Sequence, residues 1–127
     1  MSNLPVAVDL YSLAIDAASP GPQWGLETDD LNATLLVWPA GEGVAEHVND
    51  EVDVLIVGVE GEGAVTVDGR RVPLGAGQTI LVPKGSLRSV TATTPRFGHL
   101  NVHRRRRKLA VGTIPNRQAN GNEQFHP

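Results

Sequence analysis

The sequence predicts a single all-β domain, folded as a closed barrel or as a sandwich. Glycine and proline together number 23 of the 127 residues (14 Gly and 9 Pro) and are spread along the chain. Between them lie short runs rich in Val, Leu, Ile and Thr, a pattern typical of strands joined by frequent turns. No stretch shows sustained helical periodicity with caps, so we expect little helix. Closure into a barrel would remove exposed strand edges.

The length of the chain and the polarity of its ends suggest three parts. A chain of 127 residues is enough for one ordinary domain with its own core. We expect residues 1–30 to form an N-terminal strand or arm that contributes to the barrel or to a dimer. Residues 31–103 are the predicted barrel core. Residues 104–127 are predicted to be a basic segment followed by a polar C-terminal arm or tail.

Eight segments have the composition of strands, and two tight turns lie among them. In "V-T-V-D-G-R-R-V", Asp68 and Gly69 can occupy the two positive-φ positions of a hairpin turn. In "V-P-K-G-S", Pro83 fixes φ and Gly85 can take an unusual backbone angle, which also predicts a turn. The predicted strands are part of 6–15, then 31–38, 52–59, 64–67, 71–73, 79–82, 87–91 and 96–103.

Charge and composition limit what the protein is expected to bind and where it is expected to be located. The net charge of −3 is not that of a dedicated nucleic-acid binder, so we expect no nucleic-acid partner. The basic run Arg104 to Lys108 is expected to meet carboxylates on a partner subunit. The chain has no cysteine, which excludes disulfides and thiolate ligands. No apolar window is long enough to span a membrane and no secretory signal is visible, so we expect a cytoplasmic protein.

Two stretches resemble the paired motifs of the cupin superfamily. The first is "G-E-G-V-A-E-H-V-N-D-E-V-D-V-L-I-V-G-V-E-G-E-G", residues 41–63, and the second is "G-Q-T-I-L-V-P-K-G-S-L-R", residues 77–88. The resemblance covers roughly residues 31–103. It implies a small double-stranded β-helix, a jelly-roll-like barrel whose open end holds a ligand pocket. It also implies a homodimer, because small cupins commonly pair through a sheet face.

Most of the metal ligands that the resemblance would imply are missing. The first motif histidine is His47, but the second falls on Asn49 and the closing histidine falls on Arg88. The glutamate falls on Asp53 by spacing from His47, or on Val54 by spacing back from the closing glycine. With one usual ligand of four present, the dioxygenase, isomerase and decarboxylase chemistry of the superfamily does not carry over.

The guanidinium of Arg88 argues against a metal on physical grounds. It keeps its proton, offers no lone pair, and places a positive charge where a fourth ligand would lie. We expect Arg88 to pair with Asp53 or Glu51, either as a structural ion pair or with its guanidinium available to hold an anionic ligand. No cofactor is expected. The alternative is a divalent transition metal held by His47, Asp53 and His103.

A late strand carries two further histidines. In "F-G-H-L-N-V-H", His99, Asn101 and His103 share one face of the strand. If that face points inward, His99 or His103 could join His47 and Asp53 in a metal site. Leu100 and Val102 on the opposite face compete for the core, which favours histidines that face solvent or an interface.

Three functional hypotheses follow. The first is a metal-independent pocket for a small, anionic molecule, contacted by Arg88 and Asn49. If that pocket is catalytic, His47 would act as acid or base and be oriented by Glu51 or Asp53, as in an isomerase, epimerase, cyclase or lyase. The second is a metal-dependent cupin enzyme, and the third is a sensor or structural domain without catalysis. Trp38 could stack on a ligand at the barrel mouth, although core or dimer packing is the commoner role for tryptophan.

Overall fold

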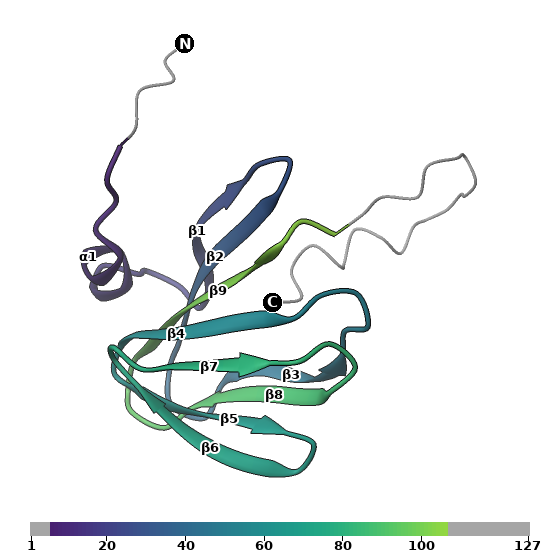
Figure 1. The fold of residues 1–127 in the computed structure, drawn as a ribbon. Helices are drawn as coiled ribbons and strands as arrows, with labels where there is room; N and C mark the ends of the chain where they lie inside the picture. Colours follow the sequence, from purple (N-terminus) through teal and green to yellow (C-terminus); the bar gives the residue numbers. More distant parts are fainter. Residues whose placement is uncertain (1–5, 107–127) are drawn as a thin grey trace.

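The computed structural model describes residues 6–106, and within them it contains one short helix and nine strands (Figure 1). The helix is α1 (Leu10–Ile15). The strands are β1 (Gly21–Glu27), β2 (Leu31–Trp38), β3 (Gly43–Val48), β4 (Val54–Glu60), β5 (Glu62–Val67), β6 (Arg70–Gly75), β7 (Thr79–Val82), β8 (Leu87–Ala92) and β9 (Phe97–Arg104).

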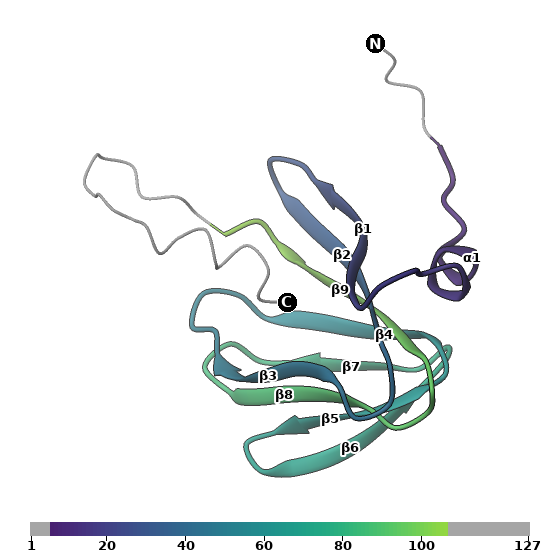
Figure 2. The same cartoon turned by 180° about the vertical axis from the view of Figure 1, so that it is seen from behind.

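The strands form two antiparallel sheets that face each other. One sheet has five strands in the order β1-β2-β9-β4-β7, and the other has four in the order β3-β8-β5-β6. Strands distant in sequence become neighbours, so β2 lies beside β9 and β3 lies beside β8, as the front and back views show (Figures 1 and 2). The arrangement is that of a double-stranded β-helix, and it confirms the predicted all-β barrel with little helix.

The two predicted turns adopt the backbone angles that their residues suggest. Asp68 and Gly69 have φ of 50° and 84° and join β5 to β6 as a hairpin. Gly85 has a φ of 87° in the connection between β7 and β8. From residue 31 onward every predicted strand is found, with ends that differ by a few residues.

Two strands were not predicted. The strand β1 contains Pro22 and lies at the edge of its sheet, where the missing backbone N–H costs no hydrogen bond to a neighbour. The strand β3 carries a register shift between Val44 and His47, which interrupts the two-residue alternation by which strands are recognised in a sequence.

The prediction of a strand within residues 6–15 is wrong, because α1 occupies this segment. The carboxylate of Asp9 caps the helix: its Oδ1 accepts from the backbone N–H of Ser12 at 3.1 Å. The apolar side chains of residues 10, 13, 14 and 17 recur at helical spacing and pack against Leu35 and Val37 of β2. The signal was missed because the helix has only six residues.

The main core fills the space between the sheets, and α1 covers part of the outer face of the five-stranded sheet. The inner cluster includes Ile56, Val65, Val90 and Phe97, all buried. In β2, Leu35 and Val37 face α1, and the intervening Leu36 is also buried. This strand is therefore covered on both faces, which explains its continuous apolar run.

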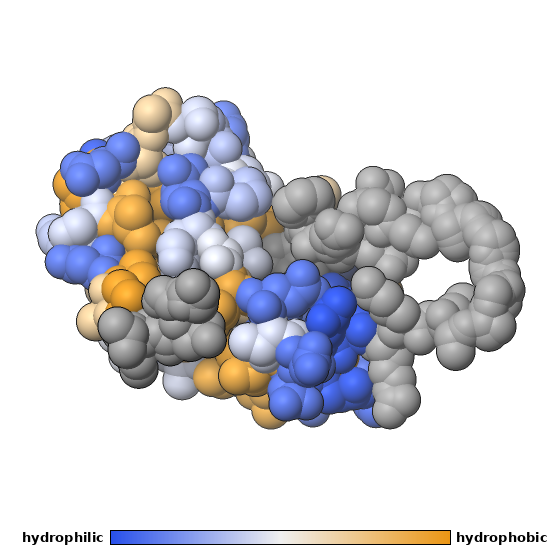
Figure 3. Space-filling model, turned by 90° about the horizontal axis from the view of Figure 1, so that it is seen from above, coloured by the Kyte–Doolittle hydropathy of each residue, from blue (hydrophilic) through white to orange (hydrophobic). Residues whose placement is uncertain are grey.

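Beyond α1, apolar side chains remain exposed on the outer face of the five-stranded sheet. The strand register aligns Leu26, Ala33, Val102, Leu55 and Leu81 in one row across all five strands. Leu81 is 56% exposed and Leu26 48%. Apolar side chains also reach the surface beside hydrophilic ones in the view from above (Figure 3). The homodimer stays a prediction.

Within residues 6–106, no helix is both long and apolar enough to cross a membrane. The N-terminal and C-terminal parts of the predicted arms, at 1–5 and 107–127, lie outside the described residues.

Candidate functional site

A bulge in β3 brings His47 opposite Arg88 of β8. Val44 pairs with Val90, and the next aligned pair is His47 with Arg88, so β3 places one more residue than β8 between these two pairs. Val44 faces the core, so regular alternation would turn His47 outward; the extra residue turns its side chain inward instead. The Nε of Arg88 then donates a hydrogen bond to Nε2 of His47 at 3.1 Å.

The hydrogen bonds of His47 fix its tautomer. Its Nδ1 lies 2.9 Å from the carbonyl oxygen of Ala45, which can only accept, so Nδ1 carries the proton. Its Nε2 must then present a lone pair to Arg88, which can only donate. His47 is therefore held as a neutral imidazole whose basic nitrogen already accepts a hydrogen bond from a guanidinium.

Arg88 lies in the interior of the barrel and is only 2% exposed. Burial, and to a smaller extent the positive charge of Arg106, lower the pKa of Arg88 to about 10. Two guanidinium groups therefore lie close enough to repel each other at this end of the barrel. An anion placed beside both groups would reduce that repulsion.

The predicted pairing of Arg88 with Asp53 or Glu51 is wrong. In the segment before β4, Val52 is buried together with Val54, the first residue of β4, whereas residues 51 and 53 are exposed. The Oδ1 of Asp53 accepts from the backbone N–H of Lys84 at 2.9 Å, and Glu51 forms an ion pair with Arg106, whose Nε lies 3.5 Å from Oε1. Neither carboxylate orients His47, whose Nδ1 bonds to a backbone carbonyl instead.

Asn49 lies just beyond the end of β3 and shapes the following turn. Its Oδ1 accepts from the backbone N–H groups of Glu51 at 2.8 Å and Val52 at 3.4 Å. Its side chain is buried, and its Nδ2 has no hydrogen-bond partner among residues 6–106. Asn49 thus combines a structural role with a buried donor two residues beyond His47.

The expectation that the histidines of β9 face outward is wrong. His99, Asn101 and His103 are 0%, 1% and 7% exposed, and they share the inner face of β9 with Phe97. Leu100 instead packs on the outer face beside α1. The apolar residues of β9 have an outer core to occupy, which the sequence argument did not foresee.

Buried His99 and half-buried Trp38 form a hydrogen-bonded pair that the sequence does not predict. The indole Nε1–H of Trp38 donates to Nε2 of His99 at 3.1 Å, and Nδ1 of His99 lies 2.8 Å from Oδ1 of Asn101. His99 therefore accepts through Nε2 and donates through Nδ1, as a neutral ring does. Burial lowers the pKa of His99 to about 4, although the hydrogen bond with Asn101 opposes the shift. Phe97 stacks on the ring with centroids 5.2 Å apart.

His103 lies at the same end of the barrel as Arg88. Burial lowers the pKa of His103; the charges of Arg106 and Arg88 also lower it, whereas its hydrogen bond to the Arg104 carbonyl and the charge of Glu27 raise it. The Nδ1 of His103 donates to that carbonyl at 2.7 Å. We call the group formed by His47, Asn49, Arg88 and His103 the mouth cluster.

The structure does not bring together the alternative metal ligands His47, Asp53 and His103. The two histidines are on the inner face, whereas Asp53 is exposed and caps the turn at Lys84. In the described part of the chain, no three His, Cys, Asp or Glu side chains form a group that could hold a metal ion. The expectation that the protein needs no metal remains a prediction.

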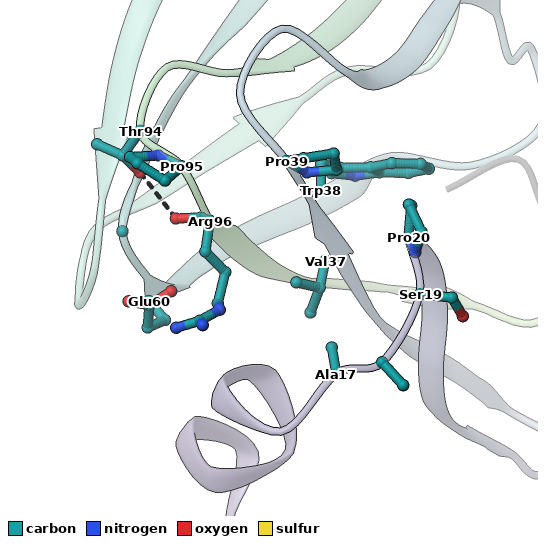
Figure 4. Close-up of a pocket in the computed structure, with 12 residues that line it drawn as sticks. Ala17, Ser19, Pro20, Val37, Trp38, Pro39, Glu60, Thr94, Pro95 and Arg96 are labelled. Atoms are coloured by element: carbon teal, nitrogen blue, oxygen red, sulfur yellow. Dashed lines mark hydrogen bonds between the residues drawn. The ribbon is translucent and has the colours of Figure 1, made fainter.

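Trp38 does not belong to the mouth cluster. It pairs with Phe97, six residues before His103 on the same strand, which corresponds to about 20 Å along β9. At its own end of the barrel, Trp38 lines a cavity of about 410 Å³ together with residues of α1–β1, β4 and the β8–β9 loop (Figure 4). It also lines a second, apolar cavity of about 360 Å³ with Pro22, Leu36 and Val44.

The described part of the basic run contacts carboxylates of the same chain. Arg105 lies 3.3 Å from Glu27 and 3.8 Å from Asp29, and Arg106 pairs with Glu51. The Nη2 of Arg104 donates to the Glu51 carbonyl at 3.1 Å. These contacts tie the end of β9 to two loops at the barrel mouth. Arg107 and Lys108 lie outside the described residues.

Comparison with known proteins agrees with this architecture. Residues 34–96 match the model of the cupin domain family. That segment contains β3, β8 and both motif stretches, including His47 and Arg88. Among curated proteins, no sequence matches the chain significantly.

Several solved structures have the same fold. A cupin protein from Bacteroides fragilis is 18% identical with a TM-score of 0.64, and the match covers 94% of each chain. An RmlC-like cupin family protein with a double-stranded β-helix fold from Methanocaldococcus jannaschii is 18% identical with a TM-score of 0.64, covering 72% of this chain and 84% of that one. A predicted oxalate decarboxylase from Thermotoga maritima is 22% identical with a TM-score of 0.56, covering 60% of this chain and 67% of that one. At these identities the likeness establishes the fold alone.

Proposed function

Since this chain belongs to the cupin superfamily, we propose that the mouth of its barrel binds a small organic anion, with Arg88 as the principal contact. The observation that carries the proposal is the buried guanidinium of Arg88 on the inner face, close enough to Arg106 for the second charge to lower its pKa. A guanidinium can hold a carboxylate or phosphate through two parallel hydrogen bonds. The buried amide nitrogen of Asn49 supplies a further donor.

The geometry supports binding rather than proton transfer by His47. A general base must present its lone pair to the substrate. The Nε2 lone pair of His47 is directed at Arg88, and Nδ1 is bonded to a backbone carbonyl. His47 therefore acts as a positioning residue that holds the guanidinium of Arg88 in place.

Calorimetric titration of the full chain with malonate, inorganic phosphate and the neutral analogue malonamide tests the proposal. We expect saturable binding of one or both anions with about one site per chain, and no saturable binding of malonamide. The preference should persist at moderate salt, because burial reduces screening of Arg88. Equal heats from malonate and malonamide would contradict an anion site.

A second prediction concerns metal content. Because the proposed site uses a guanidinium in the position of a metal ligand, untagged protein purified without added metal should contain far less than one transition-metal ion per chain. Elemental analysis by mass spectrometry measures this directly. Stoichiometric iron, zinc, nickel or manganese that survives dialysis against a chelator would contradict the metal-independent proposal.

A further inference from the structure

A separate cavity of about 410 Å³ lies at the end of the barrel opposite the mouth cluster (Figure 4). Its volume is within the range of small-molecule sites, roughly 300–1,000 Å³. Ala17 and Pro20 contribute one wall, Val37 and Trp38 of β2 another, and the segment around Glu60 and Arg96 a third. The side chain of Arg96 extends along this wall and its guanidinium lies beside Glu60 (Figure 4).

The wall that contains Glu60 and Arg96, the charged wall, is held in place by the close contact of two loops. Gly61 has a φ of 72°, and a Cβ at this position would collide with the carbonyl oxygen of Arg96. Thr94 bridges the loops: its Oγ1 donates to the Arg96 carbonyl at 2.7 Å and accepts from the backbone N–H of Glu62 at 3.0 Å. Glu60 at the end of β4 and Arg96 in the β8–β9 loop are thereby presented side by side.

The wall formed by Val37 and Trp38, the aromatic wall, is also fixed in position. The indole nitrogen of Trp38 donates to buried His99, so the ring cannot rotate without loss of a buried hydrogen bond. The backbone then continues into Pro39, which lines the same cavity. The cavity therefore has a rigid apolar side and a rigid charged side.

The charged wall lacks a partner for one of its atoms. The Oε1 of Glu60 is buried and has no hydrogen-bond partner among residues 6–106. A buried carboxylate oxygen needs a donor, and an ammonium group supplies a strong one. The guanidinium of Arg96 next to it needs an acceptor, which a carboxylate supplies through two hydrogen bonds. A ligand that satisfies both must carry an ammonium and a carboxylate close together.

We propose that this cavity is a binding site for an apolar α-amino acid. Its ammonium would donate to Glu60, its carboxylate would accept from Arg96, and its side chain would pack against Trp38 and the neighbouring prolines. The site shares no residue with the mouth cluster, so it can be tested independently of the anion site.

Fluorescence of Trp38 provides a direct readout. The chain has two tryptophans, and Trp24→Phe leaves Trp38 as the single indole. L-Phenylalanine should change its emission in a saturable way. Phenylacetate lacks the ammonium and phenethylamine lacks the carboxylate, so each should bind at least about 10-fold more weakly.

Two variants assign the contacts, and a third is the control. Glu60→Gln should bind L-phenylalanine no more tightly than it binds phenylacetate. Arg96→Gln should bind L-phenylalanine no more tightly than it binds phenethylamine. Thermal unfolding checks that both variants are folded. Arg88→Gln, at the other end of the barrel, should bind L-phenylalanine as the parent does. Absence of a saturable change in the folded parent, or unchanged binding in both Glu60→Gln and Arg96→Gln, would overturn the proposal.

Discussion

The free energy of unfolding is expected to fall by about 3 kcal/mol between pH 7 and pH 4 because of His99 alone. The pKa of this histidine is lowered from 6.5 to about 4 in the folded chain, where the ring is fully buried. Between these values the unfolded chain binds a proton that the folded chain does not. The stability is therefore fully present above about pH 6.5 and is lost as the pH falls toward 4.

Urea unfolding at pH 7, 6, 5 and 4 measures this dependence, with His99→Gln as the comparison. The variant should be less stable at pH 7, because the bond from Trp38 and the stacking on Phe97 are disturbed. Its stability should nevertheless depend less on pH, since residue 99 no longer titrates. His103 and the carboxylates are common to both proteins, so the difference isolates His99. Parallel curves for the two proteins would contradict a buried, neutral His99.

Replacement of Arg88 should have the largest effect on binding. In Arg88→Gln, the affinity for malonate or phosphate should fall about 10- to 100-fold, the effect of losing a hydrogen bond to a charged group. Arg88→Lys keeps the charge but loses the planar fork, so an intermediate affinity is expected. Titration calorimetry of the three proteins measures the series.

A matched control separates a local effect from a change in net charge. Arg71 is exposed on β6 and aligns through Thr66 with Ser89 on the outer face of the four-stranded sheet, so Arg71→Gln changes the net charge by the same amount outside the barrel interior. Its affinity for either anion should stay within about twofold of the parent, because exposed charges are screened. If Arg71→Gln weakens binding as much as Arg88→Gln, the loss of affinity reflects the change in net charge and not a contact between Arg88 and the anion.

The barrel could be predicted because its connections depend on a few residue types. The turn at Asp68 and Gly69 requires two positive φ angles, and the Pro83–Gly85 segment permits a tight bend. These requirements fix the spacing of Gly and Pro at the turns, and that spacing is kept even where the usual metal ligands are replaced. The spacing from His47 to Arg88 was therefore informative even though most of the usual metal ligands were absent.

The orientation of β9 could not be predicted in the same way. Alternation shows that Phe97, His99, Asn101 and His103 share a face, but not which face points inward. Apolar character alone predicts that Leu100 lies in the core. In the structure Leu100 packs beside α1, so the error follows from the missed helix. The large apolar Phe97 on the histidine face was the available signal for the correct orientation.

The partner of Arg88 depended on two local features that the residue types alone do not reveal. The bulge in β3 turns His47 toward Arg88, and the burial of Val52 and Val54 turns the neighbouring carboxylates away. A one-residue change in register reverses the direction of every following side chain. The sequence therefore identified the polar residues of this region but paired the wrong ones.

The side-chain Nε–H signal of Arg88 in ¹H–¹⁵N NMR spectra tests the anion site most directly. The hydrogen bond to His47 should make this signal resolvable, and its absence from Arg88→Lys would assign it. On titration with malonate, the account predicts a saturable shift of the Arg88 signal, while the signal of exposed Arg71, on the outer face of its sheet, stays in place. An Arg88 signal that does not move when malonate is bound would contradict the account.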